Sequence, residues 1–352
     1  MRAAVYHGAE DVRIESIPEP GEPGPDEVLL RVLRAAICGT DASEYAHGPR
    51  LVPLTVPHPG SGRVGPIVLG HEFVGRVEAV GENVAGIYPG DRVVPGAGVS
   101  CGTCPWCAAG RTNLCSGYYT LGLQADGGLA ELALSPARIC LPVPDACSDD
   151  AAAMAQPLAV ALHAIRRGSL EPGYAVVVIG IGGIGGFILA AAKARGAAPL
   201  IAVDVDETRL QLARSLGADH VLDARAGGVA ARIRDLTGGE GAAAVIEASG
   251  AESSPAAAVA ATRRGGQVVI VGLQAAPRAL DLCDMALREV NLTSTLAHVC
   301  DVDLPEALEL LAGSGLATTM LDRVIGLDAL VDEGLVPLVA GTARGKIVVD
   351  PA

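Results

Sequence analysis

A glycine-rich turn between a strand-like and a helix-like segment constrains this sequence more than any other feature. The turn, Gly180-Ile-Gly-Gly-Ile-Gly185, follows the apolar run Ala175–Ile179, and a helical pattern runs from Gly186 to Arg195. In a G-x-G-x-x-G turn the first glycine permits a tight bend, the second lets backbone amides approach a pyrophosphate, and the third lets helix and strand pack closely. The N-terminus of the helix then faces the phosphate charge. The pattern therefore predicts a dinucleotide-binding unit.

An acidic residue at the expected distance supports this prediction. Asp204 ends the next apolar run, about twenty residues beyond the start of the glycine turn. Its carboxylate is expected to accept hydrogen bonds from ribose hydroxyls, and no arginine directly follows it to hold a 2′-phosphate. NAD is therefore predicted rather than NADP. Arg209 either packs against the adenine or is a solvated helix charge. The predicted cofactor-binding residues are Gly180, Gly182, Gly183, Ile184, Gly185, Asp204 and Arg209.

The rest of the chain divides into two kinds of pattern. Between Val28 and Leu141, short β-like runs alternate with Gly and Pro, which predicts a compact all-β unit. An Ala-rich helix is expected from Asp150 to Ile165, and beyond it strands and helices alternate as in a parallel α/β sheet. The expected strands there are 175–179, 200–203, 220–222, 243–246 and 267–271, with a helix over 207–216. The tail is expected to add a helix over 304–311 and a strand over 346–349.

Composition narrows the class of protein. The 352 residues suffice for two domains on a prior of roughly 100–200 residues each. A net charge of -14 opposes binding to phosphate backbones and anionic lipid surfaces, so neither nucleic acid nor membrane is an expected partner. The N-terminus lacks a signal-peptide core, and no apolar run reaches about 18–20 residues. We therefore expect a cytoplasmic protein.

Four of the nine cysteines crowd into one short segment. Cys101, Cys104, Cys107 and Cys115 have the spacing C-x2-C-x2-C-x7-C. Four thiolates on a short lobe can close a tetrahedron around zinc and leave no open coordination position. The spacing predicts a structural zinc site.

A looser group of metal-ligand residues precedes this lobe. It consists of Cys38-Gly-Thr40-Asp41 and Gly70-His71-Glu72. A single Cys and a single His are more often packing residues than ligands. These two share the β-rich unit with the lobe, in a chain that also carries a dinucleotide pattern.

Together these segments resemble the zinc-dependent medium-chain dehydrogenase/reductase superfamily over essentially the whole chain. The matching pieces are Cys38–Asp41, Gly70–Gly75, Pro89–Val93, the four-cysteine lobe, the glycine turn and Gly345–Val348. The segment from Glu44 to Pro59 and Pro157-Leu-Ala-Val-Ala-Leu-His163-Ala are similar to the polyol and (R,R)-butanediol dehydrogenase branch. The resemblance implies a chaperonin-10-like β-barrel domain, residues 1–152 completed by 293–352. It also implies a doubly wound Rossmann domain over 153–292.

The resemblance also implies a catalytic zinc held by Cys38 and His71, with Glu72 and the residue before Pro157 completing the site. That residue is Gln156, where the polyol branch has an acid. Either the Gln156 carbonyl coordinates zinc or Glu72 is the ligand and Gln156 binds water. A site that has lost its zinc is the remaining alternative. Thr40 is expected to be the first proton acceptor, and Asp41 a structural hydrogen-bonding residue.

The proton route beyond Thr40 stays open. Many members of the family have a His three residues further along, where this chain has Ser43. A hydroxyl has no titration near neutral pH, unlike His. The relay runs through Ser43, through ribose hydroxyls and water, or through Glu44 or His47.

The expected activity is hydride transfer between NAD and a small secondary alcohol, vicinal diol or polyol, with a substrate like 2,3-butanediol or acetoin favoured. Two zinc ions per chain are expected, one catalytic and one structural. The alternatives are a glucose-type or sorbitol-like dehydrogenase, a zinc-free NADPH-dependent quinone or enone reductase, and a non-catalytic nucleotide-binding protein on the same scaffold. A homodimer or homotetramer is expected through the last strand, near Val290–Thr293.

Overall fold

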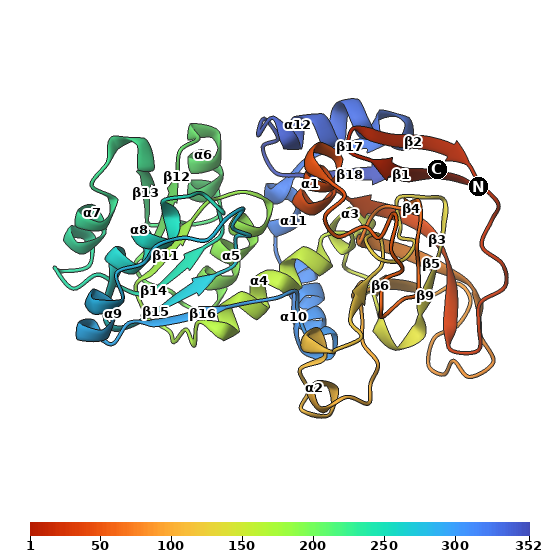
Figure 1. Ribbon diagram of the computed structural model, residues 1–352, viewed down its shortest axis with the longest axis horizontal. Coiled ribbons are helices and arrows are strands. Elements are labelled where there is room, and N and C mark those ends of the chain that lie inside the picture. The colour runs from red at the N-terminus through yellow and green to blue at the C-terminus, as the bar shows by residue number, and fades with distance from the viewer. The chain divides into compact units, whose positions relative to one another are not determined.

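The computed structural model describes residues 1–352, which form two compact units. The first unit combines Met1–Ala159 with His298–Ala352, and the second unit is Val160–Ala297 (Figure 1). The first boundary falls inside helix α4 (Ala155–Arg167), so the helix is shared by the two units. The C-terminal tail thus returns to the unit in which the chain begins.

The second unit is built on a six-stranded parallel sheet. Its order is β13-β12-β11-β14-β15-β16, so the chain reverses its direction of winding between the neighbours β11 and β14. In open α/β sheets, ligands bind outside the carboxyl ends of the strands at such a switch point. The strands are β11 (Val176–Ile179), β12 (Leu200–Asp204), β13 (His220–Asp223), β14 (Ala242–Glu247), β15 (Thr262–Ile270) and β16 (Asn291–Ser294).

Five further helices cover this sheet. α5 and α6 pack against β11, β12 and β13, while α7 and α8 contact each other and α8 packs on β14 and β15. The central strands are buried and rich in Val, Ile and Ala, as expected for strands covered on both faces. The helices are α5 (Gly183–Ala194), α6 (Glu207–Ser215), α7 (Val229–Leu236), α8 (Ser254–Ala261) and α9 (Leu282–Arg288).

The first unit is dominated by a seven-stranded sheet with the path β10-β6-β5-β3-β18-β17 and β9 paired to β3. Smaller sheets join β2-β1-β4 and β7-β8. The strands are β1 (Arg2–Gly8), β2 (Asp11–Ser16), β3 (Glu27–Ala36), β4 (Ile67–Val68), β5 (Glu72–Val80), β6 (Arg92–Pro95), β7 (Gly98–Val99), β8 (Tyr119–Thr120), β9 (Leu132–Pro136), β10 (Cys140–Pro142), β17 (Leu321–Gly326) and β18 (Lys346–Asp350). Because β18 pairs with β3, the tail completes the sheet of the first unit.

The helices of the first unit are short apart from one in the tail. They are α1 (Gly39–His47), α2 (Pro105–Ala108), α3 (Asp149–Ala152), α10 (Cys300–Gly313), α11 (Leu316–Met320) and α12 (Val336–Val339). None of the helices in the structure combines the length and the apolar composition that crossing a membrane requires.

The single helix expected from Asp150 to Ile165 is two helices, α3 and α4, separated at Ala153 and Met154. Pro157 explains the break, because proline has no N–H and its ring displaces the carbonyl four residues earlier, here that of Ala153. Proline is tolerated in a first helical turn, so a new helix begins at Ala155. The interruption fixes Gln156 near the start of α4.

Candidate metal centres and dinucleotide site

The register of β3 and β5 brings the first group of metal-ligand residues together. Ala36, the last residue of β3, pairs with Glu72, the first residue of β5. Cys38 follows β3 at the start of α1, and His71 directly precedes β5. Antiparallel pairing therefore brings Cys38 close to His71, although 33 positions (71 − 38) separate them in the sequence.

Cys38, His71 and Glu72 form a compact set of potential ligands. Their sulfur, imidazole nitrogen and carboxylate oxygen atoms all lie within 4.8 Å of one another. His71 is 5% exposed and Glu72 is fully buried. The Oε1 atom of Glu72 is buried without a hydrogen-bond partner. An unpartnered buried carboxylate oxygen beside a thiol and an imidazole fits a metal ion, which would supply the missing partner.

Asp41 braces two of these residues. Its Oδ2 atom accepts a hydrogen bond from the backbone N–H of Cys38 at 2.9 Å, which caps the start of α1. Its Oδ1 atom lies 3.5 Å from Nδ1 of His71. A carboxylate on one imidazole nitrogen leaves the other for a metal and orients the ring. Asp41 thus has the structural role expected from the sequence, and the residues that it positions are the potential ligands Cys38 and His71.

The environment of His71 favours a bound cation. Burial opposes the charged imidazole, but the negative charges of Asp41 and Cys38 outweigh it and raise the pKa of His71 well above its usual value. The negative charge that raises this pKa also attracts a metal ion, which binds in competition with the proton.

Lys346 adds a positive charge beside the group. Its Nζ atom forms an ion pair with Oε2 of Glu72 and also donates to the carbonyl oxygen of Ile37 at 2.8 Å. Lys346 is 4% exposed and begins β18, the strand next to β3. Three neighbouring strands therefore place Lys346, Ile37 and Glu72 in contact. Glu72 pairs with the lysine through Oε2, while its Oε1 atom has no hydrogen-bond partner.

The candidates for proton transfer lie on α1. Oγ1 of Thr40 is 3.6 Å from Sγ of Cys38, and Ser43 follows one helical turn later on the same helix face. The Glu44 carboxylate is buried and accepts hydrogen bonds from the backbone N–H groups of Arg50 and Leu51 at 2.8–3.2 Å. It holds the following loop in place. His47 is exposed at the end of α1.

Gln156 is the second residue of α4, and its side chain is 7% exposed. It belongs to the first unit, with Cys38, His71 and Glu72. His163 on the same helix accepts a hydrogen bond at Nδ1 from Arg166 at 3.3 Å. This agrees with a packing role for His163.

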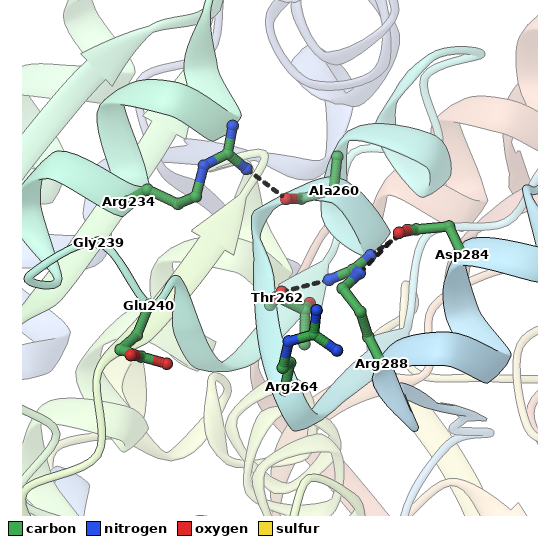
Figure 2. Close-up of a pocket in the computed structure, with 8 residues that line it drawn as sticks. All are labelled: Arg234, Gly239, Glu240, Ala260, Thr262, Arg264, Asp284 and Arg288. Atoms are coloured by element: carbon green, nitrogen blue, oxygen red, sulfur yellow. Dashed lines mark hydrogen bonds and ion pairs between the residues drawn. The ribbon is translucent and has the colours of Figure 1, made fainter.

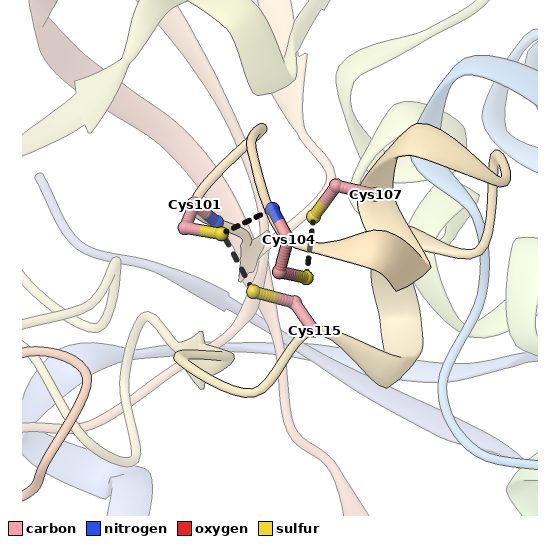
Figure 3. A group of neighbouring side chains, drawn as sticks. All are labelled: Cys101, Cys104, Cys107 and Cys115. Atoms are coloured by element: carbon pink, nitrogen blue, oxygen red, sulfur yellow. Dashed lines mark hydrogen bonds between the residues drawn. The ribbon is translucent and has the colours of Figure 1, made fainter.

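The four lobe cysteines form the second potential metal site (Figure 3). Their sulfur atoms lie within 4.8 Å of one another. Four sulfurs at about 2.3 Å from a tetrahedral zinc are about 3.8 Å apart, so little contraction is needed. Backbone N–H groups already point at the sulfurs: Cys104 donates to Cys101 at 3.3 Å, and Cys101 donates to Cys115 at 3.2 Å. Such donors suit thiolate ligands.

Local hydrogen bonds set the acidity of this lobe. Donors from Thr103 and Cys104 lower the pKa of Cys101 to about 6, while burial raises the pKa of Cys115 to about 11. A bound divalent cation removes this difference, because coordination deprotonates thiols outright. The lobe, which includes α2 and a 3₁₀ turn at Thr112–Leu114, thus has the donor set of a closed zinc site.

The glycine turn lies between β11 and α5, at the switch point of the parallel sheet. Gly180 has φ +89°, which a residue with a side chain rarely adopts. A Cβ at Gly185 would collide with the carbonyl oxygen of Gly180. The Asp204 carboxylate ends β12 and accepts a hydrogen bond from the N–H of Ile181 at 2.6 Å. The acid is therefore directly attached to the turn.

Asp204 also accepts from the N–H groups of Val205 and Asp206 at 2.7 and 3.0 Å. Asp206 caps α6 by accepting from the N–H of Arg209 at 3.0 Å. Arg209 is half-buried in the first turn of α6, two residues into the helix that follows the acid.

A separate hollow of about 480 Å³ in the second unit carries three arginines (Figure 2). Arg234 donates to the carbonyl oxygen of Ala260 at 3.0 Å, and Arg288 donates to that of Thr262 at 2.6 Å. These carbonyls lie at the C-terminus of α8, so the arginines stabilise a helix end. Thr262 begins β15, so the hollow lies at the amino ends of the parallel strands, whereas Gly180 lies at their carboxyl ends. This hollow is therefore separate from the dinucleotide site. Its lining residues are Arg234, Gly239, Glu240, Ala260, Thr262, Arg264, Asp284 and Arg288.

Two family models match the chain. A model described as "Alcohol dehydrogenase GroES-like domain" matches residues 24–145, and one described as "Zinc-binding dehydrogenase" matches residues 183–313. They cover the glycine turn from Gly183 onward, the four-cysteine lobe and the group around Cys38 and His71. The expected fold class, a chaperonin-10-like domain plus a Rossmann domain, is confirmed.

Similar proteins agree with these models. The (R,R)-butanediol dehydrogenase of Bacillus subtilis (strain 168) is 33% identical over 353 residues, covering 100% of both chains. The sorbitol dehydrogenase of Homo sapiens is 38% identical over 311 residues, covering 88% of this chain and 84% of its own. The crystal structure of 2R,3R-butanediol dehydrogenase from Bacillus subtilis superimposes with a TM-score of 0.93 at 32% identity, covering 100% of this chain and 99% of the other.

The matches extend over both units, and the relatives act on CH–OH groups according to their names. The zinc-free reductase alternative does not agree with the zinc-binding model or with the two groups of potential ligands. The chain belongs to the zinc-dependent medium-chain dehydrogenase/reductase superfamily, in its polyol and butanediol dehydrogenase branch, and is an NAD-dependent enzyme that acts on CH–OH donors.

Proposed function

We propose that this enzyme interconverts a small vicinal diol of the 2,3-butanediol type and the matching hydroxyketone. The observation that carries the proposal is the similarity to a butanediol dehydrogenase over 100% of both chains. A structural match of TM-score 0.93 to an enzyme of the same specificity supports it. We place the enzyme in the cytoplasm, where the nine cysteines remain reduced and available to metal.

A longer polyol such as sorbitol is the second candidate. It is favoured by 38% identity to a sorbitol dehydrogenase, but that similarity covers only 88% of this chain. The butanediol dehydrogenase match includes the whole loop from Gly48 to Gly65. The Glu44 carboxylate accepts hydrogen bonds from the N–H groups of Arg50 and Leu51 in this loop.

For the catalytic zinc we propose the ligands Cys38, His71, Glu72 and Gln156. The orphaned Oε1 atom of Glu72 supports its role as a ligand, and the Lys346 ammonium offsets the charge of the same carboxylate. Gln156 supplies a neutral oxygen as the fourth ligand or holds a water molecule. Cys101, Cys104, Cys107 and Cys115 hold the structural zinc.

When bound, zinc supplies Lewis acidity toward the substrate oxygen and the nicotinamide supplies the hydride acceptor. We propose that the Thr40 hydroxyl accepts the proton of the substrate alcohol, since it lies 3.6 Å from the ligand Cys38. As it does so, the Thr40 hydroxyl passes its own proton on along α1 to Ser43 and through water to the solvent. The bonds of Glu44 to Arg50 and Leu51 argue against Glu44 as a relay. For NAD we propose Gly180, Gly182, Gly183, Ile184, Gly185, Asp204 and Arg209 as binding residues.

Substrate class is tested by following NADH formation with (R,R)-, (S,S)- and meso-2,3-butanediol, sorbitol, glucose and 2-propanol. The proposal expects the highest kcat/KM with one butanediol stereoisomer. A higher kcat/KM with sorbitol or glucose supports the second candidate instead. Absence of turnover with every alcohol by the zinc-loaded enzyme contradicts both.

Zinc content of Gln156→Ala and Glu72→Ala separates the two open ligand assignments. Loss of one zinc from Glu72→Ala, with retention by Gln156→Ala, identifies Glu72 as the ligand and Gln156 as a water-binding residue. Loss from Gln156→Ala identifies the amide as a ligand. Cys283→Ala is the control, because Cys283 is exposed and lies outside both groups.

For the assembly we propose a homodimer in which two copies of β16 pair across a twofold axis. β16 is one of the two edge strands of the parallel sheet, and β13 is the other (Figure 1). Leu282 and Leu287 on α9 are 70% and 73% exposed, and Leu292 on β16 is 43% exposed. An open edge beside apolar side chains is an association surface. Leu292→Glu is expected to give a monomeric mass in solution, while Val64→Glu, at another exposed apolar residue, keeps the dimer. A wild-type monomer contradicts the proposal.

A further inference from the structure

Glu247 is a fully buried carboxylate at the carboxyl end of β14 in the second unit. Its Oε1 atom accepts hydrogen bonds from the N–H and hydroxyl of Ser249 at 2.8 and 2.6 Å, the N–H of Gly250 at 2.9 Å and the hydroxyl of Ser254 at 2.8 Å. Its Oε2 atom lies 3.4 Å from the side-chain amide of Gln274. All of these partners are neutral.

Burying a carboxylate without a cation costs free energy, which hydrogen bonds offset only in part. We therefore ask what the hydrogen bonds of Glu247 hold in place. Here the bonds converge on the short loop after β14. Four donors from three residues meet one oxygen, so the Ser249–Gly250 loop and the start of α8 are fastened at a single point. The backbone carbonyl of Glu247 also accepts from Val271 and Gly272 at 2.8 and 3.0 Å, which fastens the loop after β15.

The loop at Ser249 and Gly250 packs closely against Gly180, the first glycine of the dinucleotide turn. A Cβ at Gly180 would lie 2.6–2.7 Å from the Cβ, Cα and N atoms of Ser249. A Cβ at Gly250 would lie 2.8 Å from the carbonyl oxygen of Leu273. The loops after β11, β14 and β15 are thus in close backbone contact. They surround the switch point, where a dinucleotide binds in this kind of sheet.

We propose that Glu247 is a positioning residue for the dinucleotide. Through Ser249 and Gly250 it sets the position of the loop that supports Gly180, and so it prearranges the phosphate-binding turn before the cofactor arrives. This inference rests on the glycine turn being the NAD site. Loosening the loop weakens dinucleotide binding, because binding must then also order the loop. It leaves the reacting groups of the first unit unchanged.

The test compares Glu247→Leu with Glu247→Gln in the zinc-loaded enzyme. Leucine fills similar space but accepts no hydrogen bond, whereas a glutamine oxygen can keep all four bonds made by Oε1. We expect Glu247→Leu to raise the Kd for NADH and the KM for NAD about tenfold or more, with kcat within about threefold of wild type. Glu247→Gln is expected to stay within about threefold of wild type in all three constants.

Glu240→Leu is the matched control, because Glu240 is an exposed glutamate just before β14, at the amino ends of the same parallel strands. An unchanged Kd for Glu247→Leu overturns the proposal, as does an equal loss in Glu247→Leu and Glu247→Gln. If Glu247→Leu does not fold, Ser249→Ala and Ser254→Ala each remove a donor. If both serine variants then bind NADH with wild-type affinity, the proposal for Glu247 is overturned. NADH binding is measured without any alcohol, so failure of the diol proposal leaves this result interpretable.

Discussion

Lys346 forms a buried ion pair with Glu72, although 274 residues separate them in the chain. The contact depends on β18 from the C-terminal tail lying beside β3, which in turn pairs with β5. In the group of potential metal ligands, Oε2 of Glu72 thus pairs with Lys346 from the tail, while Oε1 has no hydrogen-bond partner. The tail thus completes the catalytic unit chemically as well as structurally.

Lys346→Met is expected to lower the free energy of unfolding by about 3–5 kcal/mol, because it leaves the Glu72 charge buried without its partner. Urea unfolding of the zinc-loaded protein measures this. Lys193→Met is the control, since Lys193 pairs with Asp219 at 3.4 Å on the surface. That variant is expected to change the free energy by about 0.5 kcal/mol or less. A loss below about 1 kcal/mol in Lys346→Met contradicts the assigned role.

Asp41→Asn is expected to weaken zinc binding at the catalytic site about 10–100-fold. The substitution keeps the shape of the side chain but removes the charge that faces His71 at 3.5 Å. Competition with a chelator measures the dissociation constant. In Asp328→Asn, which alters an exposed partner of Arg2, both zinc sites are expected to be unaffected. Equal zinc affinity in wild type and Asp41→Asn would show that Asp41 only caps α1.

Cys104→Ser is expected to release the lobe zinc and leave the catalytic zinc in place. A closed tetrathiolate site contributes directly to folding, so the thermal midpoint is expected to fall. Zinc analysis should give one ion per chain, with NADH formation retained at temperatures below the new midpoint. Loss of both ions would contradict the independence of the two sites.

Asp204→Ala is expected to raise the KM for NAD about tenfold or more and to reduce the preference for NAD over NADP. The change removes the carboxylate that we propose as the acceptor for ribose hydroxyls, and with it the bond from the N–H of Ile181. Steady-state kinetics with both cofactors measure the ratio. Asp223→Ala, at the end of the neighbouring strand β13, is the control and should leave the ratio unchanged. An unchanged ratio in Asp204→Ala would remove Asp204 from the NAD site.

The sequence predicted the parts of the molecule whose signals are local. The glycine turn, the acid at Asp204 and the four-cysteine spacing each lie within one or two neighbouring elements. The strands from 175 to 271 were predicted because buried parallel strands are continuous apolar runs. The Ala-rich pattern around Pro157 predicts one helix, where the structure has α3 and α4 because proline interrupts the pattern.

The sequence did not predict contacts that depend on strand register. Lys346 was visible only as part of Gly345–Val348, and nothing near it in the chain indicates Glu72 as its partner. Glu247 ends β14 with no local sign that Ser249 and Ser254 would turn back toward it. Asp41 carried a local signal, since an acid three residues after Cys38 caps a helix, but its approach to His71 required the pairing of β3 with β5.

Zinc content measured together with NADH formation tests the central claim most directly. Wild-type protein is expected to hold two zinc ions per chain and to form NADH from a 2,3-butanediol stereoisomer. Cys38→Ser is expected to hold one zinc ion and to form none. A wild-type enzyme with a single zinc, or a Cys38→Ser variant that keeps the wild-type rate, would contradict the assignment of Cys38, His71 and Glu72 as the catalytic metal site.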